Sequence, residues 1–185
     1  MKSFVCTLIP LILFFSGLLF PGPAPAAGPG LEGTWKFVQA GSTDIVTWGN
    51  SLLQIEISAA DGKVRVLHEL LERGSVAFAD TLEFRPGRGD VRSVVRSEVW
   101  PDNWFMGVLS SVGDSRTVSG HWLEPEKSFR VITRQAVRTS QGKTTVTTTR
   151  DYTLGSEGKT LTLSEKRSSR PSPVVLLFER KEPSR

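Results

Sequence analysis

Hydrophobic and polar residues alternate along most of the chain from Thr34 onward, and glycine interrupts the alternation at short intervals. A period of two is typical of β-strands with one buried face. No stretch of 12 or more residues shows the 3.6-residue spacing of an amphipathic helix, so the pattern predicts an all-β chain. The candidate strands cover residues 34–40, 51–59, 63–71, 75–85, 91–100, 104–111, 115–124, 128–139, 144–154, 159–166 and 173–181.

Three glycine-containing turns allow the strand register to be predicted. They lie at residues 60–63, 140–143 and 156–159, and each has glycine where a two-residue hairpin turn needs positive φ. Closing each hairpin at that turn puts apolar residues on one shared face. The predicted pairs are Ile57 with Val66, Ile55 with His68 and Leu53 with Leu70; Val137 with Val146, Val131 with Tyr152 and Phe129 with Leu154; and Leu154 with Leu161, Tyr152 with Leu163 and Arg150 with Glu165.

A sheet of about ten antiparallel strands with one apolar face must cover that face, either as a barrel or as a sandwich. The predicted connections are short and follow chain order, which favours an antiparallel up-and-down β-barrel over Greek-key crossovers. We expect one such domain over residues 28–185.

The first 27 residues have the features of a signal peptide. Lys2 precedes an apolar run, residues 8–20, which Pro10 interrupts and which is too short for a comfortable membrane span. Ala24-Pro25-Ala26 supplies the small residues of a cleavage site. We therefore expect export to the periplasm or the extracellular medium, without stable membrane insertion after cleavage.

Composition excludes several function classes. Cys6 is the only cysteine and lies in the leader, so the mature protein has no disulfide, thiolate nucleophile or cysteine metal site. His68 and His121 are the only histidines, and no metal site or cofactor is expected. A net charge of +4 is too small to indicate a nucleic-acid partner. The chain carries no Gly-x-Ser-x-Gly, Walker or His-Glu-x-x-His motif, so we expect no catalytic residues and no enzyme.

Two segments resemble a known superfamily. Leu31-Glu32-Gly33-Thr34-Trp35 resembles the first-strand G-x-W signature of the lipocalins and the wider calycin superfamily. Residues 151–162 and 177–180 look like the ending of small exported bacterial lipocalin-like proteins. The resemblance implies that Trp35 closes one end of the barrel and that Arg180 stacks on it, a cation–π contact that contributes about 1 to 2 kcal/mol when partly desolvated.

Polar residues share the apolar face of the predicted barrel. Arg150 shares the inward parity of Tyr152, and Gln135 shares that of Phe129 and Val131 on the preceding strand. Glu165 is the predicted cross-strand partner of Arg150 and so also points inward. Our hypothesis is that Arg150, Tyr152, Gln135 and His68 form the polar end of an apolar cavity and orient a ligand's acidic or carbonyl head. Fatty-acid-binding calycins use an Arg-x-Tyr pair in this way, and residues 150–152 have that spacing. The alternative is that Arg150 and Glu165 form a structural ion pair near the barrel mouth and that His68 is a hydrogen-bonded or rim histidine without a ligand contact.

Two functions remain open from the sequence. The first is an exported, non-catalytic binding protein for a small apolar or amphipathic molecule. The second is a filled barrel that serves as a structural or protein-interaction module of the cell envelope, for example an inhibitor or accessory protein. A measurable interior space favours the first, and a solid core with an exposed apolar patch favours the second.

Overall fold

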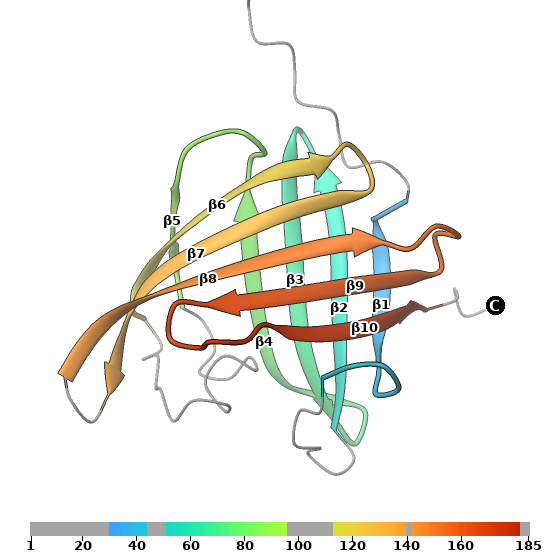
Figure 1. Ribbon diagram of the computed structural model, residues 1–185, viewed down its shortest axis with the longest axis horizontal. Coiled ribbons are helices and arrows are strands. Elements are labelled where there is room, and N and C mark those ends of the chain that lie inside the picture. Colours follow the sequence, from blue (N-terminus) through green and yellow to red (C-terminus); the bar gives the residue numbers. More distant parts are fainter. Residues whose placement is uncertain (1–29, 44–50, 96–112, 140–141, 182–185) are drawn as a thin grey trace, which may run out of the picture.

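The computed structural model describes residues 30–43, 51–95, 113–139 and 142–181. These residues form ten β-strands and one antiparallel sheet (Figure 1). The strands are β1 (Gly33–Val38), β2 (Ser51–Ala60), β3 (Lys63–Glu72), β4 (Ser75–Phe84), β5 (Val91–Val94), β6 (Ser115–Glu124), β7 (Ser128–Thr139), β8 (Gly142–Leu154), β9 (Thr160–Arg167) and β10 (Val174–Arg180).

The strand order confirms the predicted up-and-down barrel. Neighbours in the sheet follow chain order from β4 back to β1 and from β10 back to β5, and β1 pairs with β10 to join the two meanders. Strands β1 to β4 cross strands β6 to β10 steeply, so the sheet folds over on itself into two layers (Figure 1). The two ends of the sheet are β4 and β5, and the backbone ladder does not close between them in the described residues.

Two of the three predicted hairpin registers are confirmed. The β2–β3 hairpin pairs Ile55 with His68 around a two-residue turn at residues 61–62. The β8–β9 hairpin pairs Arg150 with Glu165 as predicted, around a longer turn in which the Gly158 amide donates to the Gly155 carbonyl oxygen. Gly62 and Gly158 have φ values of 69° and 70° at these turns, a conformation that glycine adopts without strain.

The predicted register of the β7–β8 hairpin is wrong by two residues. Thr139 pairs with Gly142, so the connection lies one residue nearer the N-terminus than predicted. Gly142 has its positive φ of 115° at the start of β8 instead of at the centre of the turn. Because the shift is even, every side chain keeps its predicted face. The corrected pairs are Val137 with Thr144, Val131 with Arg150 and Phe129 with Tyr152.

The tryptophan of the G-x-W segment is buried beneath Arg180, the residue expected to stack on it. Trp35 is fully buried, and the Arg180 guanidinium lies over its ring, 4.1 Å from the centroid. Arg180 also donates to the carbonyl oxygens of Glu32 (2.7 Å), Gly158 (3.0 Å) and Gly30. A Cβ on Gly33, at φ 129°, would lie 2.8 Å from the Arg180 Nη1 atom, which explains why glycine precedes the tryptophan by two residues.

Several sequence predictions lie outside the described residues. They are the signal peptide at residues 1–27, the candidate strand at 104–111 and the second half of the candidate strand at 91–100. Within the part of the chain that the structure describes, no helix is long and apolar enough to cross a membrane.

Candidate ligand-binding site

The inner face of β7, β8 and β9 changes from apolar to polar along the strands. Because side chains alternate, successive inward positions form rows across the three strands. The register gives three rows: Phe129, Tyr152 and Leu163; then Val131, Arg150 and Glu165; then Thr133, Thr148 and Arg167. The interior of this layer is therefore amphipathic, and Arg150 and Tyr152 lie at the boundary.

Glu165 lies between two arginines in the polar half. Arg150 Nε donates to Glu165 Oε2 over 2.8 Å, and Arg167 Nε lies 3.3 Å from Glu165 Oε1. The side chains of Arg150 and Glu165 are only 2% and 9% exposed. Removing one partner of a buried ion pair costs about 3 to 5 kcal/mol when the other is left uncompensated. Here Glu165 keeps Arg167 when Arg150 is removed, so part of that cost is avoided.

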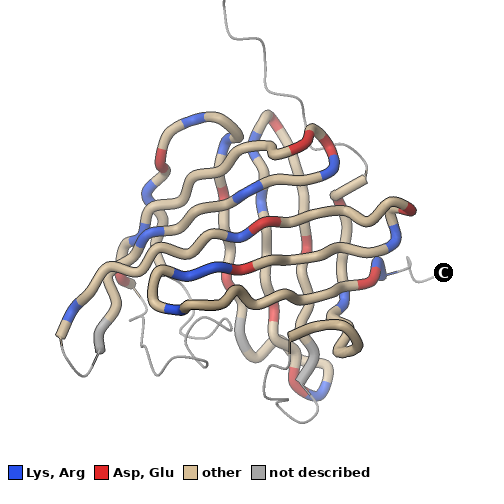
Figure 2. The backbone as a smooth tube through the Cα atoms, viewed as in Figure 1, with Lys and Arg blue, Asp and Glu red and all other residues tan. Residues whose placement is uncertain are grey.

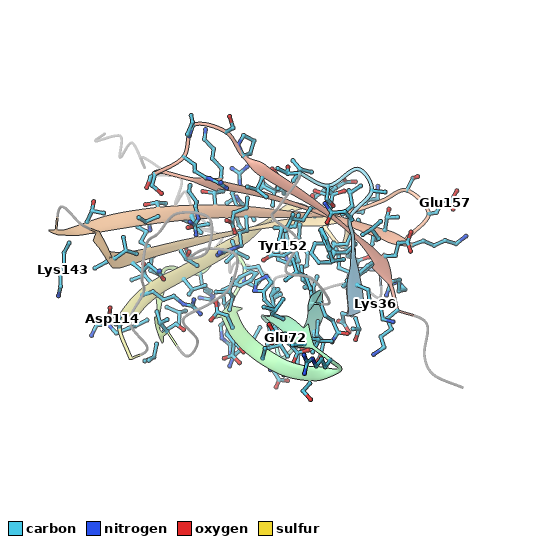
Figure 3. All side chains as sticks on the ribbon, turned by 90° about the horizontal axis from the view of Figure 1, so that it is seen from below. Lys36, Glu72, Asp114, Lys143, Tyr152 and Glu157 are labelled. Atoms are coloured by element: carbon cyan, nitrogen blue, oxygen red, sulfur yellow. The ribbon has the colours of Figure 1, made fainter. Side chains whose placement is uncertain are left out.

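His68 links the layer that contains β3 to the polar residues of β8 and β9. It projects inward from β3, and its Nε2 atom lies 2.8 Å from the Tyr152 hydroxyl. The Tyr152 ring stacks on Phe129 with centroids 4.7 Å apart. Figure 3 shows Tyr152 between the two layers, whereas Lys143 and Glu157 lie at the periphery. Tyr152 and His68 are fully buried, so His68 does not lie at the barrel rim.

A second buried ion pair was not predicted from the sequence. Arg116 of β6 donates to both carboxylate oxygens of Asp80 of β4, over 2.8 and 2.7 Å, and to the Thr81 carbonyl oxygen over 2.8 Å. Asp80 lies directly opposite His68 in the β3–β4 ladder. The alternation of inward and outward side chains could have indicated this pair. Asp80 and Arg116 occupy inward positions, two residues before the buried Leu82 and Val118.

Gln135 lies apart along the barrel from Tyr152, with which the sequence hypothesis grouped it. The register places it opposite Val146 on β8 and Arg116 on β6. It is six positions along β7 from Phe129, the residue opposite Tyr152. Gln135 therefore belongs to the Arg116 end of the interior, and the structure brings together His68 with Tyr152 and Arg150 with Glu165.

The arrangement places several hydrogen-bond donors where they could meet an oxygen-rich anion or a carbonyl group. Guanidinium groups, a phenol and an imidazole are hydrogen-bond partners for carboxylate oxygens. No group of three or more potential metal-ligating side chains occurs among the described residues. Arg150, Tyr152 and His68 are almost completely inaccessible to solvent, so a ligand that reaches them must displace side chains or enter as the barrel opens.

The outer face of the same strands carries charges that are largely paired. Arg130 donates from Nε and Nη2 to the two Asp151 carboxylate oxygens over 2.7 Å, and these hydrogen bonds raise the pKa of Arg130. Arg134 lies 3.2 Å from Asp90. In Figure 2, β7 carries blue segments only, whereas β8 and β9 carry both blue and red segments.

Comparison with known proteins identifies the fold. No protein-family model matches the chain, and no curated protein sequence matches it. Among solved structures, the chain is similar to the REP1-NXSQ fatty acid transporter, with 7% identity over 83% of this chain and 98% of that one, at a TM-score of 0.50. It is also similar to a Schistosoma mansoni fatty acid binding protein in complex with arachidonic acid, with 12% identity over 84% and 99% of the two chains, at a TM-score of 0.50. The chain therefore shares the antiparallel β-barrel fold of these two structures.

Proposed function

We propose that this protein is an exported, non-catalytic carrier that binds a small amphipathic molecule with an acidic head inside its barrel. The observation that carries the proposal is the amphipathic interior, in which buried Arg150 and Tyr152 separate an apolar row from polar rows. The proposed export rests on the leader-like composition of residues 1–27. The two similar structures with fatty-acid names agree with this ligand class.

In this proposal the acidic head replaces part of the buried polar network. A carboxylate near Arg150 accepts from its guanidinium in place of Glu165, which keeps Arg167 as a partner. The Tyr152 hydroxyl, oriented by His68, supplies a second donor. The apolar tail then packs among residues such as Phe129 and Leu163. Burial of both parts makes an amphipathic molecule a better fit than a wholly apolar one.

Paired ligands test the role of Arg150. Titration calorimetry with a sixteen-carbon fatty acid and the alcohol of the same length isolates the contribution of the head group. We expect the wild type to prefer the acid by about tenfold or more, because a hydrogen bond to a charged group contributes roughly 1.5 to 3 kcal/mol. Arg150→Met should abolish the preference while leaving alcohol binding within about threefold.

Arg130→Met is the matched control for this experiment. Like Arg150, Arg130 is paired with a carboxylate on the neighbouring strand, here Asp151 across the β7–β8 ladder. Unlike Arg150, Arg130 faces outward. The control should keep the preference for the acid. A folded Arg150→Met protein, verified by circular dichroism, that keeps the full preference would remove Arg150 from the site.

A filled barrel that acts through its outer surface is the second candidate. The complete burial of Trp35, Tyr152 and His68 favours it, because side chains lining an open, water-accessible cavity would be partly exposed. Wild-type protein that binds neither the acid nor the alcohol would support this function over the carrier.

A further inference from the structure

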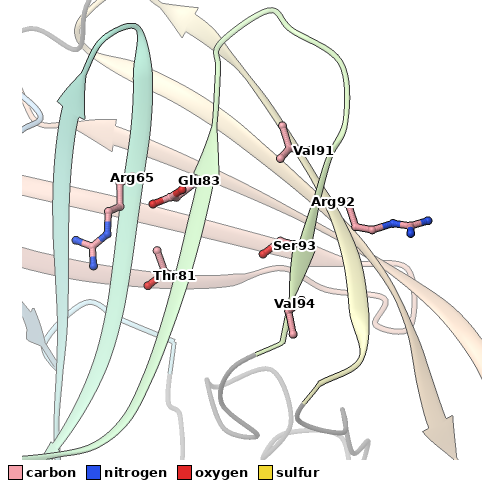
Figure 4. A pocket seen from close by; sticks show the side chains of 7 residues that line it. All are labelled: Arg65, Thr81, Glu83, Val91, Arg92, Ser93 and Val94. Atoms are coloured by element: carbon pink, nitrogen blue, oxygen red, sulfur yellow. The ribbon is translucent and has the colours of Figure 1, made fainter.

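Among the described strands, the hydrogen-bonded wall of the barrel is interrupted at one seam, between β4 and β5. Strands β4 and β5 are the two edges of the sheet, whereas each other described strand pairs with a neighbour on both sides. A pocket of about 320 Å³ lies along the seam (Figure 4). Its lining comes from β3 and β4 on one side and from β5 on the other: Arg65, Thr81, Glu83, Val91, Ser93 and Val94.

The two seam strands carry exposed apolar side chains. Four large hydrophobic residues are exposed among the described residues, and three of them are Val76 of β4 and Val91 and Val94 of β5, at 53%, 41% and 51% exposure. Val91 and Val94 also line the seam pocket. An apolar molecule approaching the barrel therefore meets a partly apolar surface at this place.

Side chains hold the seam where the backbone ladder is missing. Arg116 crosses it to bind both carboxylate oxygens of Asp80 and the Thr81 carbonyl oxygen. The side chains of this pair are 6% and 7% exposed. We name the Asp80 and Arg116 pair the latch.

Toward the end of β4, the seam is fixed by close packing. The Gly87 amide donates to the Gly120 carbonyl oxygen over 2.9 Å. Phe84 lies so near Gly120 that a Cβ there would be 2.4 Å from two ring atoms. The seam is thus anchored at this end, and the latch lies four residues earlier on β4.

The latch also contacts the proposed site through one residue. Asp80 is the cross-strand neighbour of His68, and His68 is hydrogen-bonded to Tyr152. Separating β4 from β5 and β6 at the latch would therefore expose the boundary between the apolar and polar halves of the interior.

We propose that the ligand enters through the seam between β4 and β5, and that the Asp80–Arg116 latch sets the rate of opening. This inference rests on the proposed function, because an entrance requires a ligand. Opening the wall at any other described pair of strands breaks a ladder of backbone hydrogen bonds. Opening it at the seam separates one ion pair and a few flanking contacts, so local opening is easiest there.

Uptake kinetics test the entrance. The latch variant is Asp80→Asn with Arg116→Gln, which removes both charges and keeps polar side chains at both positions. The control is Asp151→Asn with Arg130→Gln, which removes a bidentate pair of the same chemistry from within the β7–β8 ladder. In stopped-flow mixing with a fluorescent polyene fatty acid, we expect the latch variant to accelerate uptake and release by about tenfold or more, with the Kd changed by less than about threefold. The control should match the wild type.

Hydrogen exchange on the ligand-free protein tests the latch without any ligand. Amides of β4, β5 and β6 should exchange about tenfold faster in the latch variant, while those of β8 and β9 keep their wild-type rates. Wild-type uptake and exchange in the folded latch variant would overturn the inference. Faster exchange at the seam in a protein that binds no fatty acid would support the latch but reject the entrance together with the carrier function.

Discussion

Replacing Trp35 by alanine tests the expectation that this side chain closes one end of the barrel. The side chain is fully buried, its Nε1 atom donates to the Leu31 carbonyl oxygen over 3.1 Å, and Arg180 lies on its ring. A tryptophan buries roughly 200 Å², which at about 25 cal/mol per Å² corresponds to about 5 kcal/mol. Measured truncations of buried tryptophan and phenylalanine cost about 3 to 5 kcal/mol, so we expect about 4 kcal/mol for Trp35→Ala.

Urea unfolding followed by far-ultraviolet circular dichroism measures this loss. With a slope of about 2 kcal/mol per M, the midpoint should fall by about 2 M. Trp35→Phe is the matched variant: it keeps a ring beneath Arg180 and loses the Nε1 hydrogen bond to Leu31, so its loss should include about 1 kcal/mol for that bond and stay well below the alanine loss. A loss under about 1 kcal/mol for Trp35→Ala would show that Trp35 does not close the barrel.

Three further substitutions test local geometry by urea unfolding. Gly33→Ala should cost about 1 to 3 kcal/mol, and more than Gly142→Ala, because both glycines have positive φ but only Gly33 has a guanidinium within 4 Å of the new Cβ. Gly120→Ala should cost about 1 to 3 kcal/mol, because the new methyl group displaces a packed ring at the seam; wild-type stability would refute that close packing. Tyr152→Phe should cost about 1 kcal/mol or more by removing the partner of His68 Nε2, and it should weaken acid binding more than alcohol binding. Equal weakening of both ligands would show that the hydroxyl does not meet the head group.

Local sequence patterns predicted most of the strands, because side chains alternate between the two faces of a strand and the alternation of apolar and polar residues shows which face is buried. The strands β6 and β7 begin and end where alternation and turn residues place them, at 115–124 and 128–139. The β7–β8 register failed because glycine at position 142 is compatible with two turn placements, and alternation cannot distinguish registers that differ by two residues.

The buried ion pairs could be predicted from the sequence where the two partners lie on one hairpin, and were missed where they do not. The Arg150 and Glu165 pair follows from a single hairpin, so one turn fixes it. Asp80 and Arg116 lie 36 positions apart on strands that share no ladder, and only the curvature of the whole sheet brings them together. The grouping of Gln135 with Tyr152 failed for a related reason, since parity gives the face of a residue but not its height along the barrel.

Native mass spectrometry tests the carrier function most directly. The protein would be purified without denaturation from exported expression, then measured as isolated and after incubation with a sixteen-carbon fatty acid. The carrier function predicts a one-to-one complex that survives gentle ionisation and disappears on denaturation. A folded protein that shows only the ligand-free mass in both samples would contradict it and favour the filled barrel.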